Sequence, residues 1–299
     1  MMIPIESGMT QVMIVNMVCT DFSFSSPADW IQLSGHADAF AFGRPGILCK
    51  RCSSDGNEAI AYELLMNDPL RPFVPQYSGT VPYGDERYII LENLLSHFKN
   101  PNIMDIKMGT RTFLEEEVSN DKPRHDLYEK MVKLDANAVN EAEKEIKAVT
   151  KSKYMIFREK MSSSSTLGFR IEAFKTDLQT KAKDLFLVKS RDQVKEVLNK
   201  FLPSKLEHIK KIIDRLHRLR ASLQSSPFFA NHEVVGSSLL IVYDECKVGV
   251  WMIDFAKTVP LPNGIDIDHS SPWIKGNHED GYLFGLDNLI DILEELLIE

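Results

Sequence analysis

The 299-residue sequence has little cysteine and no long apolar run. Four cysteines are too few for a disulfide-built fold of this size, and Cys49 and Cys52 form a CxxC without the second CxxC or histidine pair that would complete a zinc site. We interpret them as ordinary reduced cysteines. No stretch approaches the roughly 18 apolar residues that cross a bilayer. The nearest approach to a secretory signal, residues 12–19, is short and has no Lys or Arg before it, so we expect a cytoplasmic protein without membrane insertion.

Positive charge is also in short supply. The chain has 35 Lys and Arg against 43 Asp and Glu, a formal charge of −8. This balance argues against a nucleic-acid binder, which would normally be basic. Hydrophobic residues make up 43% of the sequence, an ordinary value for a folded chain. The length predicts about two domains, or one domain with two lobes.

The charge is unevenly distributed along the chain. Residues 1–43 contain no Lys or Arg, residues 147–175 contain seven bases and two acids, and residues 254–299 contain two bases and ten acids. A local excess of bases can attract a polyanionic ligand even on an acidic protein. The simpler alternative is a solvated helix face, and charge alone does not decide between the two.

Apolar patterning predicts a small, sheet-rich first lobe followed by a helical block. Strand patterns cover residues 46–52 and 87–91, with a helix at 58–66 between them. Helices are predicted at 126–134 and 141–149, and a serine run at 162–165 is typical of a loop.

Strands and long helices are predicted to alternate in the remaining chain. Expected strands cover residues 168–175, 238–243 and 248–253, and a closing helix covers 283–298. Capping-box patterns open two further helices, at Ser190–Gln193 and Ser204–Glu207. The second of these helices carries a basic face that we expect to be solvated, formed by Lys210, Lys211, Arg215 and Arg218.

Three short segments carry candidate chemistry. Asp105 and Lys107 share one face of a predicted strand, where a carboxylate and an ammonium can orient a hydroxyl and hold a phosphate. Asp254 ends an apolar strand, a usual place for a Mg²⁺ ligand in phosphoryl transfer. Lys50 lies on an early strand, and the helix after it carries Glu58. This order is that of a kinase-like ATP site.

Two familiar kinase motifs are missing. No GxGxxG precedes Lys50, and no HRD catalytic loop follows, so the sequence is not that of an ordinary protein kinase. Each remaining signal is weak alone, because a buried Asp or Lys on a strand is often half of a structural ion pair.

Longer motifs identify a family resemblance. PNIMDIKMGTRTFLEEE contains the PxxxDxKxG signature of the inositol polyphosphate kinases. SSSSTLGFRIEAFK, GSSLLIVYD, VWMIDFAKTVPLP and GNHEDGYLFGLDNLIDIL resemble the inositol 1,4,5-trisphosphate 3-kinases in particular. The resemblance runs from about Trp30 to the C-terminus. It implies transfer of a phosphate from ATP, with Mg²⁺, to the 3-hydroxyl of inositol 1,4,5-trisphosphate, giving the 1,3,4,5-tetrakisphosphate of calcium signalling.

The resemblance also implies an α+β fold with two protein-kinase-like lobes and a helical substrate-binding insert. The implied regions are a variable leader at 1–29, an ATP-binding lobe at 30–107, an inositol-phosphate-binding insert at 108–165 and a C-terminal lobe with the metal site at 166–299. The basic cluster would then neutralise the substrate phosphates through charge-assisted hydrogen bonds.

Site roles follow residue by residue from the same resemblance. Lys50 would contact the nucleotide phosphates, and the backbone of Glu92, Asn93 and Leu94 would bind adenine. Asp254 would hold Mg²⁺ with Ser238 nearby, Asp105 would orient the attacking hydroxyl, and Lys107 would lie between the two substrates. The remaining substrate-binding residues would be Arg124, Lys151, Tyr154, Arg158 and Lys257, with Lys175 reaching either substrate or ATP.

Two other functions share these features. A broader inositol polyphosphate multikinase would have the same ATP-side motifs and differ in the insert. A non-catalytic inositol-phosphate-binding adaptor would keep the fold, but Lys50, Asp105, Lys107 and Asp254 are all present.

Calmodulin is a further partner that the family suggests. Its members commonly carry a basic, aromatic calmodulin-binding segment before the WIQL motif, whereas residues 16–29 contain no base here. Calmodulin binding through this stretch is therefore not expected. The weaker candidate at 126–134 is expected to pack on the substrate site.

Overall fold

The computed structural model describes residues 39–42, 45–118, 121–176, 185–203 and 205–298. The expected leader at 1–29, with the stretch compared to calmodulin-binding segments, lies outside these residues. Among the described residues, no helix is both long and apolar enough to cross a membrane.

The described part of the first lobe is a four-stranded antiparallel sheet with helix α2 (Asn57–Leu65), in line with the predicted sheet-rich lobe. The central strand β4 is apolar without alternation because both of its faces are buried. Ile89 and Leu91 face the main core, whereas Tyr88 and Ile90 enter a smaller cluster with Cys49. The strand order is β1 (Phe40–Phe42), β2 (Ile47–Arg51), β4 (Glu86–Glu92) and β3 (Tyr77–Tyr83).

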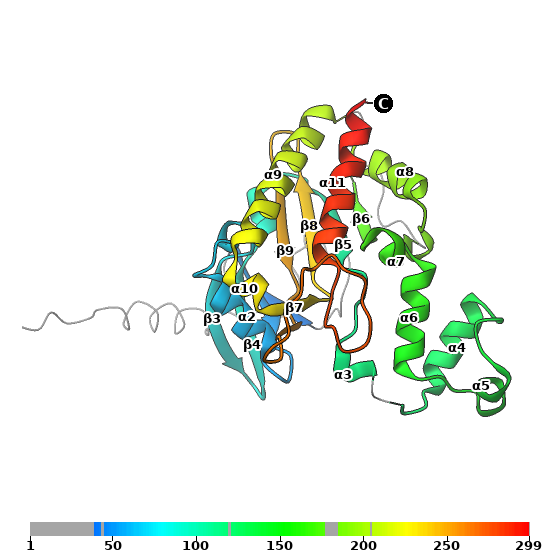
Figure 1. The fold of residues 1–299 in the computed structure, drawn as a ribbon. Coiled ribbons are helices and arrows are strands. Elements are labelled where there is room, and N and C mark those ends of the chain that lie inside the picture. Colours follow the sequence, from blue (N-terminus) through cyan, green and yellow to red (C-terminus); the bar gives the residue numbers. More distant parts are fainter. Residues whose placement is uncertain (1–38, 43–44, 119–120, 177–184, 204, 299) are drawn as a thin grey trace, which may run out of the picture.

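A second antiparallel sheet forms the centre of the C-terminal lobe. Its strand order is β6 (Phe169–Lys175), β5 (Asn102–Met108), β8 (Ser238–Tyr243) and β9 (Val248–Ile253). Helices α8 (Arg191–Phe201), α9 (Leu206–Ser225) and α11 (Tyr282–Ile298) cover one face of this sheet (Figure 1). On β5, Met104, Ile106 and Met108 face the core. The alternate residues of β5 therefore point to the opposite face, where the site lies.

Shorter elements connect these layers. A two-stranded sheet pairs β7 (His232–Val235) with β10 (Lys257–Pro260) beside the short helix α10 (Pro227–Ala230). Short 3₁₀ turns lie at η2 (Arg71–Phe73), η3 (Leu94–His97) and η4 (Leu185–Leu187).

The segment between β5 and β6, called the insert below, is largely helical. Its helices α4, α5 and α6 project from the rest of the molecule (Figure 1). The insert has a small hydrophobic cluster of its own, which includes Leu127, Met131 and Tyr154. Leu127 and Met131 are therefore core residues of the insert. Its helices are α3 (Glu115–Val118), α4 (His125–Leu134), α5 (Glu141–Ile146), α6 (Lys151–Met161) and α7 (Ser164–Leu167).

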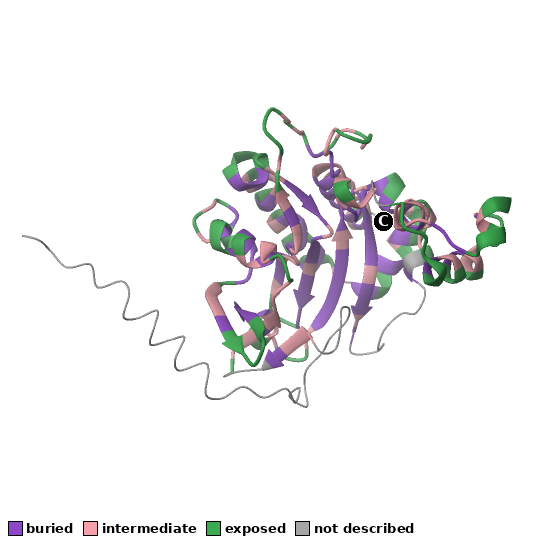
Figure 2. Cartoon of the chain, turned by 90° about the horizontal axis from the view of Figure 1, so that it is seen from below, coloured by how far each residue is buried: buried purple, intermediate pink, exposed green. Residues whose placement is uncertain are grey.

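One hydrophobic core runs through both lobes. Tyr62 of α2 packs edge-on against Phe255, which follows β9, with ring centroids 5.1 Å apart. The buried residues concentrate along the strands, and the exposed ones lie at the outside (Figure 2). Helix α2 is thus held by the C-terminal lobe as well as by its own sheet.

The first predicted capping box forms at Ser190, and two other sequence predictions need correction. Helix α9 has Lys205 as its N-cap, and Ser204, which opens the second predicted capping box, lies outside the described residues. The serine run is only partly a loop, because α7 begins at Ser164. The basic face of α9 is only partly solvated, since Arg215 donates hydrogen bonds to the carbonyls of Val250 and Pro72 at 2.8 Å.

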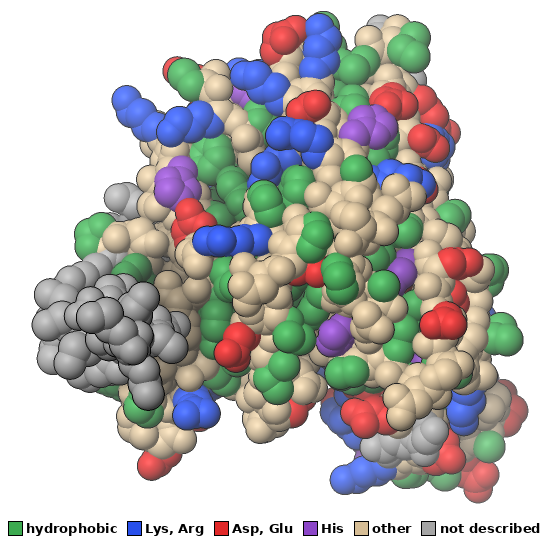
Figure 3. Space-filling view, turned by 60° about the vertical axis from the view of Figure 1, so that its left-hand side comes forward, with side chains coloured by type: hydrophobic (Ala, Val, Ile, Leu, Met, Phe, Trp, Pro, Cys, Tyr) green, Lys and Arg blue, Asp and Glu red, His purple; other side chains and the backbone are tan. Residues whose placement is uncertain are grey.

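The other three bases of the predicted face are exposed as expected. Lys210, Lys211 and Arg218 are open to solvent, and basic side chains gather over the upper part of the face that Figure 3 shows. Arg215 differs because its guanidinium lies over the rings of Phe73 and Trp251 and joins the two lobes.

A close glycine contact sets the distance between α11 and the end of β5. A Cβ on Gly285 would lie 2.0 Å from the carbonyl oxygen of Gly168, and that oxygen accepts a hydrogen bond from the Gly109 N–H at 2.7 Å. Gly109 itself has φ +95°, and a Cβ there would lie 2.8 Å from the Asp280 carbonyl oxygen. The glycine of the PxxxDxKxG signature is therefore required by the backbone.

We predict that Gly285→Ala lowers the free energy of unfolding by about 1–3 kcal/mol, because the added methyl must displace backbone. Urea denaturation measures the change. Asp291→Ala, at an exposed position of the same helix, is the control and should change stability little. Equal losses in the two variants would contradict the steric explanation.

Candidate active site

A cavity of about 600 Å³ lies between the two lobes. Its walls come from the first sheet, from the chain that joins the lobes, from the open face of β5 and from the first residues after β9. Apolar side chains line the part nearest the joining chain, and they include Leu48, Leu91, Ile103, Leu240 and Ile253. An apolar slot beside the chain that joins the lobes suits an aromatic ring.

Lys50 stands at the inner end of the cavity between two carboxylates. Its Nζ lies 2.7 Å from Glu58 Oε1 and 2.6 Å from Asp254 Oδ1. Strand β2 directs Lys50 toward α2, which carries Glu58, and Asp254 follows β9 in a left-handed conformation with φ 65°. The sequence order Lys, helix Glu, strand Asp thus becomes one cluster in space.

Electrostatics favour the charged forms of Lys50 and Asp254, whereas burial raises the pKa of Glu58. Burial alone would lower the pKa of Lys50, but the charges of Asp254 and Glu58 outweigh it and raise that pKa. Burial would likewise raise the pKa of Asp254, and the nearby charges of Lys50 and Lys107 hold it below the ordinary value. Asp254 therefore remains an anion, and its side chain is 37% exposed toward the cavity.

Asp105 and Lys107 line the cavity from the open face of β5, as their spacing predicts. Lys107 Nζ donates to the Gly236 carbonyl at 2.9 Å. Ser238 of β8 pairs with Lys107 on one side and with Ile253 on the other, so it lies next to the strand end that carries Asp254. Ser238 Oγ is buried and has no hydrogen-bond partner among the described residues. A buried hydroxyl oxygen near a carboxylate fits a hard cation.

The predicted hinge connects β4 to η3. Asn93 donates its backbone N–H to the Gly46 carbonyl at 2.8 Å, and its side chain accepts from the Leu95 N–H at 3.1 Å. Glu92, Asn93 and Leu94 all line the cavity. The turn therefore places the joining chain at the apolar slot.

Lys257 and Lys151, two of the predicted substrate residues, meet at one carboxylate. Lys257 lines the cavity, and its Nζ lies 2.7 Å from Glu117 Oε2 and 3.1 Å from the Thr112 carbonyl oxygen. Lys151 Nζ pairs with Glu117 Oε1. Residues from β10 and from the first turn of α6 are thereby brought side by side.

The cavity lining includes the predicted substrate residues Lys107 and Lys257, but not Lys151, Arg124, Tyr154, Arg158 or Lys175. Arg124 makes a two-point pair with Asp126, with both N–O distances 2.8 Å, on the insert surface. Tyr154 is 8% exposed within the insert cluster. The positive charge of Arg158 helps to lower the pKa of Glu172. Lys175 pairs with Ile103 across the sheet, at the end of β6.

Sequence reasoning missed two charged residues of the cavity, Arg170 and Glu172. Arg170 Nε donates to Glu172 Oε1 at 2.8 Å. Burial would raise the pKa of Glu172, but Arg170 and Lys107 outweigh it and lower that pKa. The register between β5 and β6 shifts between Asp105 and Ile106, which changes the opposing residues along β6. Alternating polar residues on β6 were the available signal.

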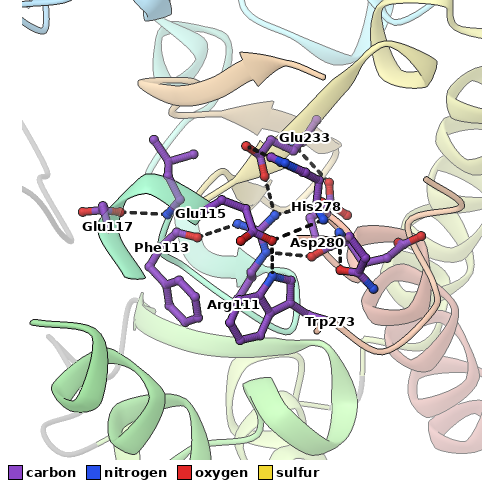
Figure 4. A network of polar contacts seen from close by, with 12 residues as sticks. Arg111, Phe113, Glu115, Glu117, Glu233, Trp273, His278 and Asp280 are labelled. Atoms are coloured by element: carbon purple, nitrogen blue, oxygen red, sulfur yellow. Dashed lines mark hydrogen bonds and ion pairs between the residues drawn. The ribbon is translucent and has the colours of Figure 1, made fainter. Parts of the chain in front are cut away.

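A buried arginine anchors the start of the insert. Arg111 is 1% exposed and donates to the carbonyls of Glu279 at 2.7 Å, Phe113 at 2.6 Å and His278 at 2.8 Å, and it also pairs with Glu233 (Figure 4). These bonds tie the chain after β5 to the loop before α11. The segment that leads into α3 is thus fixed on the C-terminal lobe.

The arrangement of the first lobe, α2 and β9 is that of kinase-like folds, in which a strand lysine pairs with a helix glutamate beside a metal-binding aspartate. The model of the family "Inositol polyphosphate kinase" matches residues 88–294. The chain belongs to the inositol polyphosphate kinase family.

Individual relatives show which members of this family the chain resembles. The chain is 49% identical to inositol-trisphosphate 3-kinase C of Mus musculus over 273 residues, covering 89% of this chain and 40% of that protein. It is 46% identical to inositol-trisphosphate 3-kinase A of Homo sapiens, covering 89% and 59%. The chain thus spans less than two thirds of the length of these relatives.

A solved structure confirms the predicted fold class. The inositol phosphate multikinase Ipk2 of S. cerevisiae, solved with ADP and Mn²⁺, superposes with a TM-score of 0.53 at 19% identity. The superposition covers 83% of this chain and 99% of that one.

Glu159 of α6 gives the insert a pH-dependent attachment. Its Oε1 accepts from Thr112 N at 2.6 Å and from Thr112 Oγ1 at 3.0 Å. Burial raises the pKa of Glu159 from 4.5 to about 7, against the opposing effect of these bonds and of nearby arginines. The folded state therefore binds a proton that the unfolded state has released between these two pH values. The cost of burying the charged form is fully present above pH 7 and is lost as the pH falls toward 4.5.

We predict that Glu159→Gln, which keeps the acceptor oxygen, is more stable than the parent chain at pH 8 by up to about 3 kcal/mol. The difference should shrink toward pH 5. Urea unfolding across this pH range measures it, and the exposed Glu116→Gln is the control. A stability difference that does not vary with pH would exclude this role of Glu159.

Proposed function

We propose that the chain transfers the γ-phosphate of ATP to the 3-hydroxyl of inositol 1,4,5-trisphosphate. The observation that carries the proposal is the arrangement along one cavity. Lys50 and Asp254 stand at its inner end, Asp105 and Lys107 lie in its wall, and Lys257 lies on the side of the insert. The similarity to inositol-trisphosphate 3-kinases supports the choice of acceptor.

ATP would occupy the apolar slot and the inner end. The backbone of Glu92–Leu94 would meet the adenine, and the leucine and isoleucine side chains would enclose its ring. Lys50 would bind the phosphates, held in position by Glu58 at 2.7 Å. Lys175 would approach from the end of β6. An ammonium fixed between two carboxylates keeps its third donor for a phosphate oxygen.

Magnesium would be held by Asp254, with the Ser238 hydroxyl nearby. Within the described residues, no group of three or more His, Cys, Asp or Glu side chains is placed to hold a metal. One carboxylate suits Mg²⁺, because this ion is usually held by one or two carboxylates, substrate phosphates and water. When bound, it would neutralise charge on the β- and γ-phosphates.

The acceptor hydroxyl would lie against Asp105. Asp105 is 3% exposed in the cavity wall, where its carboxylate can accept the hydroxyl proton and orient the oxygen. Lys107 shares this strand face and would lie between the transferred phosphate and the substrate, stabilising charge that develops during transfer. The chain thus contributes mainly positioning and electrostatics.

The insert at 108–165 would receive the inositol phosphate between the ATP-binding lobe at 30–107 and the C-terminal lobe at 166–299. Lys151 and Lys257 would bind one phosphate together, and Arg158 and Arg124 would approach others from the insert. Tyr154 would contribute by fixing α6, since its ring is packed in the insert cluster. Arg170 joins this set because it lines the same cavity.

Incubation of the chain with Mg²⁺, ATP and the trisphosphate should give the 1,3,4,5-tetrakisphosphate, identified by chromatography against standards and by ³¹P NMR. Absence of this product from folded protein would contradict the proposal. Comparable rates on several inositol phosphates would favour a multikinase, and binding without transfer would favour an adaptor.

We predict that Asp254→Asn reduces turnover below detection while the fold survives, because the site loses both the anionic metal ligand and a partner of Lys50. Phosphate transfer is measured with labelled ATP, and thermal unfolding is followed in parallel. Asp214→Asn, at an exposed position of α9, is the matched control and should keep the normal rate. A near-normal rate in Asp254→Asn would remove Asp254 from the metal role.

A further inference from the structure

Three consecutive glutamates form most of the short helix α3, and they point to different partners. Glu115 Oε1 accepts from Trp273 Nε1 at 2.7 Å, and its carboxylate also accepts from the Gly276 N–H at 3.1 Å. Glu116 is exposed. Glu117 pairs with Lys151 and Lys257. Figure 4 shows that Glu115 points into the Arg111 network and that Glu117 points away from it.

Contacts other than those with the two lysines also fix the Glu117 side chain. Its Oε2 accepts from the Leu114 N–H at 2.8 Å, and its side chain is only 14% exposed. Burial would raise the pKa of Glu117, but the hydrogen bonds from Lys151 and Lys257 outweigh it and hold that pKa below the ordinary value. Since Glu115 and Arg111 tie α3 to the C-terminal lobe, the carboxylate has a fixed place.

The two lysines would not stay together by themselves. Lys151 comes from the insert and is 41% exposed, whereas Lys257 comes from β10 and is 34% exposed. Two ammonium groups that pair with the same carboxylate repel each other, and long, partly exposed side chains can turn away into water. The Glu117 carboxylate offers one oxygen to each ammonium, which offsets this repulsion and fixes the spacing of the two lysines.

The lysines keep donors for a ligand. An ammonium has three N–H donors. Lys257 uses one on Glu117 and one on the Thr112 carbonyl, which leaves one for a ligand in the cavity that it lines. We propose that Glu117 is a positioning residue that presents Lys151 and Lys257 as one preformed phosphate-binding pair. This inference rests on the proposed function, in which the two lysines bind the same phosphate.

The proposal makes Glu117 act on substrate binding rather than on the transfer step. Asp105 and Asp254 surround the reacting groups, whereas Glu117 lies on the insert side of the cavity. Loss of its charge should therefore raise KM for the trisphosphate and leave kcat nearly unchanged. If Glu117 had only a structural role, its substitution would lower the stability of the chain, or would change kcat and KM together.

We predict that Glu117→Gln raises KM for the trisphosphate about tenfold, with kcat within about threefold, because one charge-assisted contact is worth roughly that factor. The control Glu116→Gln should match the parent chain in both constants. Thermal unfolding checks that each variant is folded. An unchanged or lower KM in folded Glu117→Gln would overturn the proposal.

A double-mutant cycle separates positioning from direct contact. In a Lys257→Met background, Glu117→Gln should raise KM much less than it does in the parent chain, because Glu117 acts through the lysines. Equal effects in both backgrounds would also overturn the proposal.

Calorimetric binding of the trisphosphate without ATP keeps this test separate from the proposed function. A parent chain that binds but does not phosphorylate the trisphosphate would refute the function, and weaker binding by Glu117→Gln would still support the positioning role. A phosphorylating parent chain with unaltered binding in Glu117→Gln would refute the positioning role alone.

Discussion

The ammonium of Lys50 joins three separate parts of the chain, and the active cavity depends on it. Glu58 comes from the helix of the first lobe, and Asp254 comes from the end of β9 in the second. A buried charge is costly unless it is paired, so the ion pairs favour the arrangement in which all three groups meet. The contact between Tyr62 and Phe255 holds α2 in the same arrangement by packing. The distance between the lobes, and with it the room for a nucleotide, follows from these contacts.

Carboxylates organise the positive charge of the cavity. Glu172 pairs with Arg170 beside Lys107, and Glu117 pairs with two lysines from different elements. The cavity lining holds four cations, Lys50, Lys107, Arg170 and Lys257, together with four acids, in a chain with a net charge of −8. Each acid lowers the local charge by one but fixes the cations in place, and fixed cations lose less conformational entropy on meeting a phosphate.

The sequence was sufficient to predict the fold class, both sheets in part, and the meeting of Lys50, Glu58 and Asp254. Asp105 and Lys107 were predictable because strand spacing alone determines which side chains share a face. The sequence did not show that Arg170 and Glu172 line the cavity, because the register shift between β5 and β6 depends on tertiary packing. Glu117 was hidden for a similar reason, since spacing within one element does not show which distant lysines approach it. The family resemblance places Tyr154 at the substrate, and its packing in the insert cluster is a tertiary contact that the sequence did not predict.

A crystal structure of the chain with Mg²⁺, a non-hydrolysable ATP analogue and inositol 1,4,5-trisphosphate would test most directly that one cavity aligns both substrates. The terminal phosphate of the analogue should lie between Lys50 and Asp254, with the inositol 3-hydroxyl facing Asp105 and one ring phosphate contacting both Lys151 and Lys257. A trisphosphate bound away from this cavity, or one that presents a different hydroxyl to Asp105, would contradict that alignment.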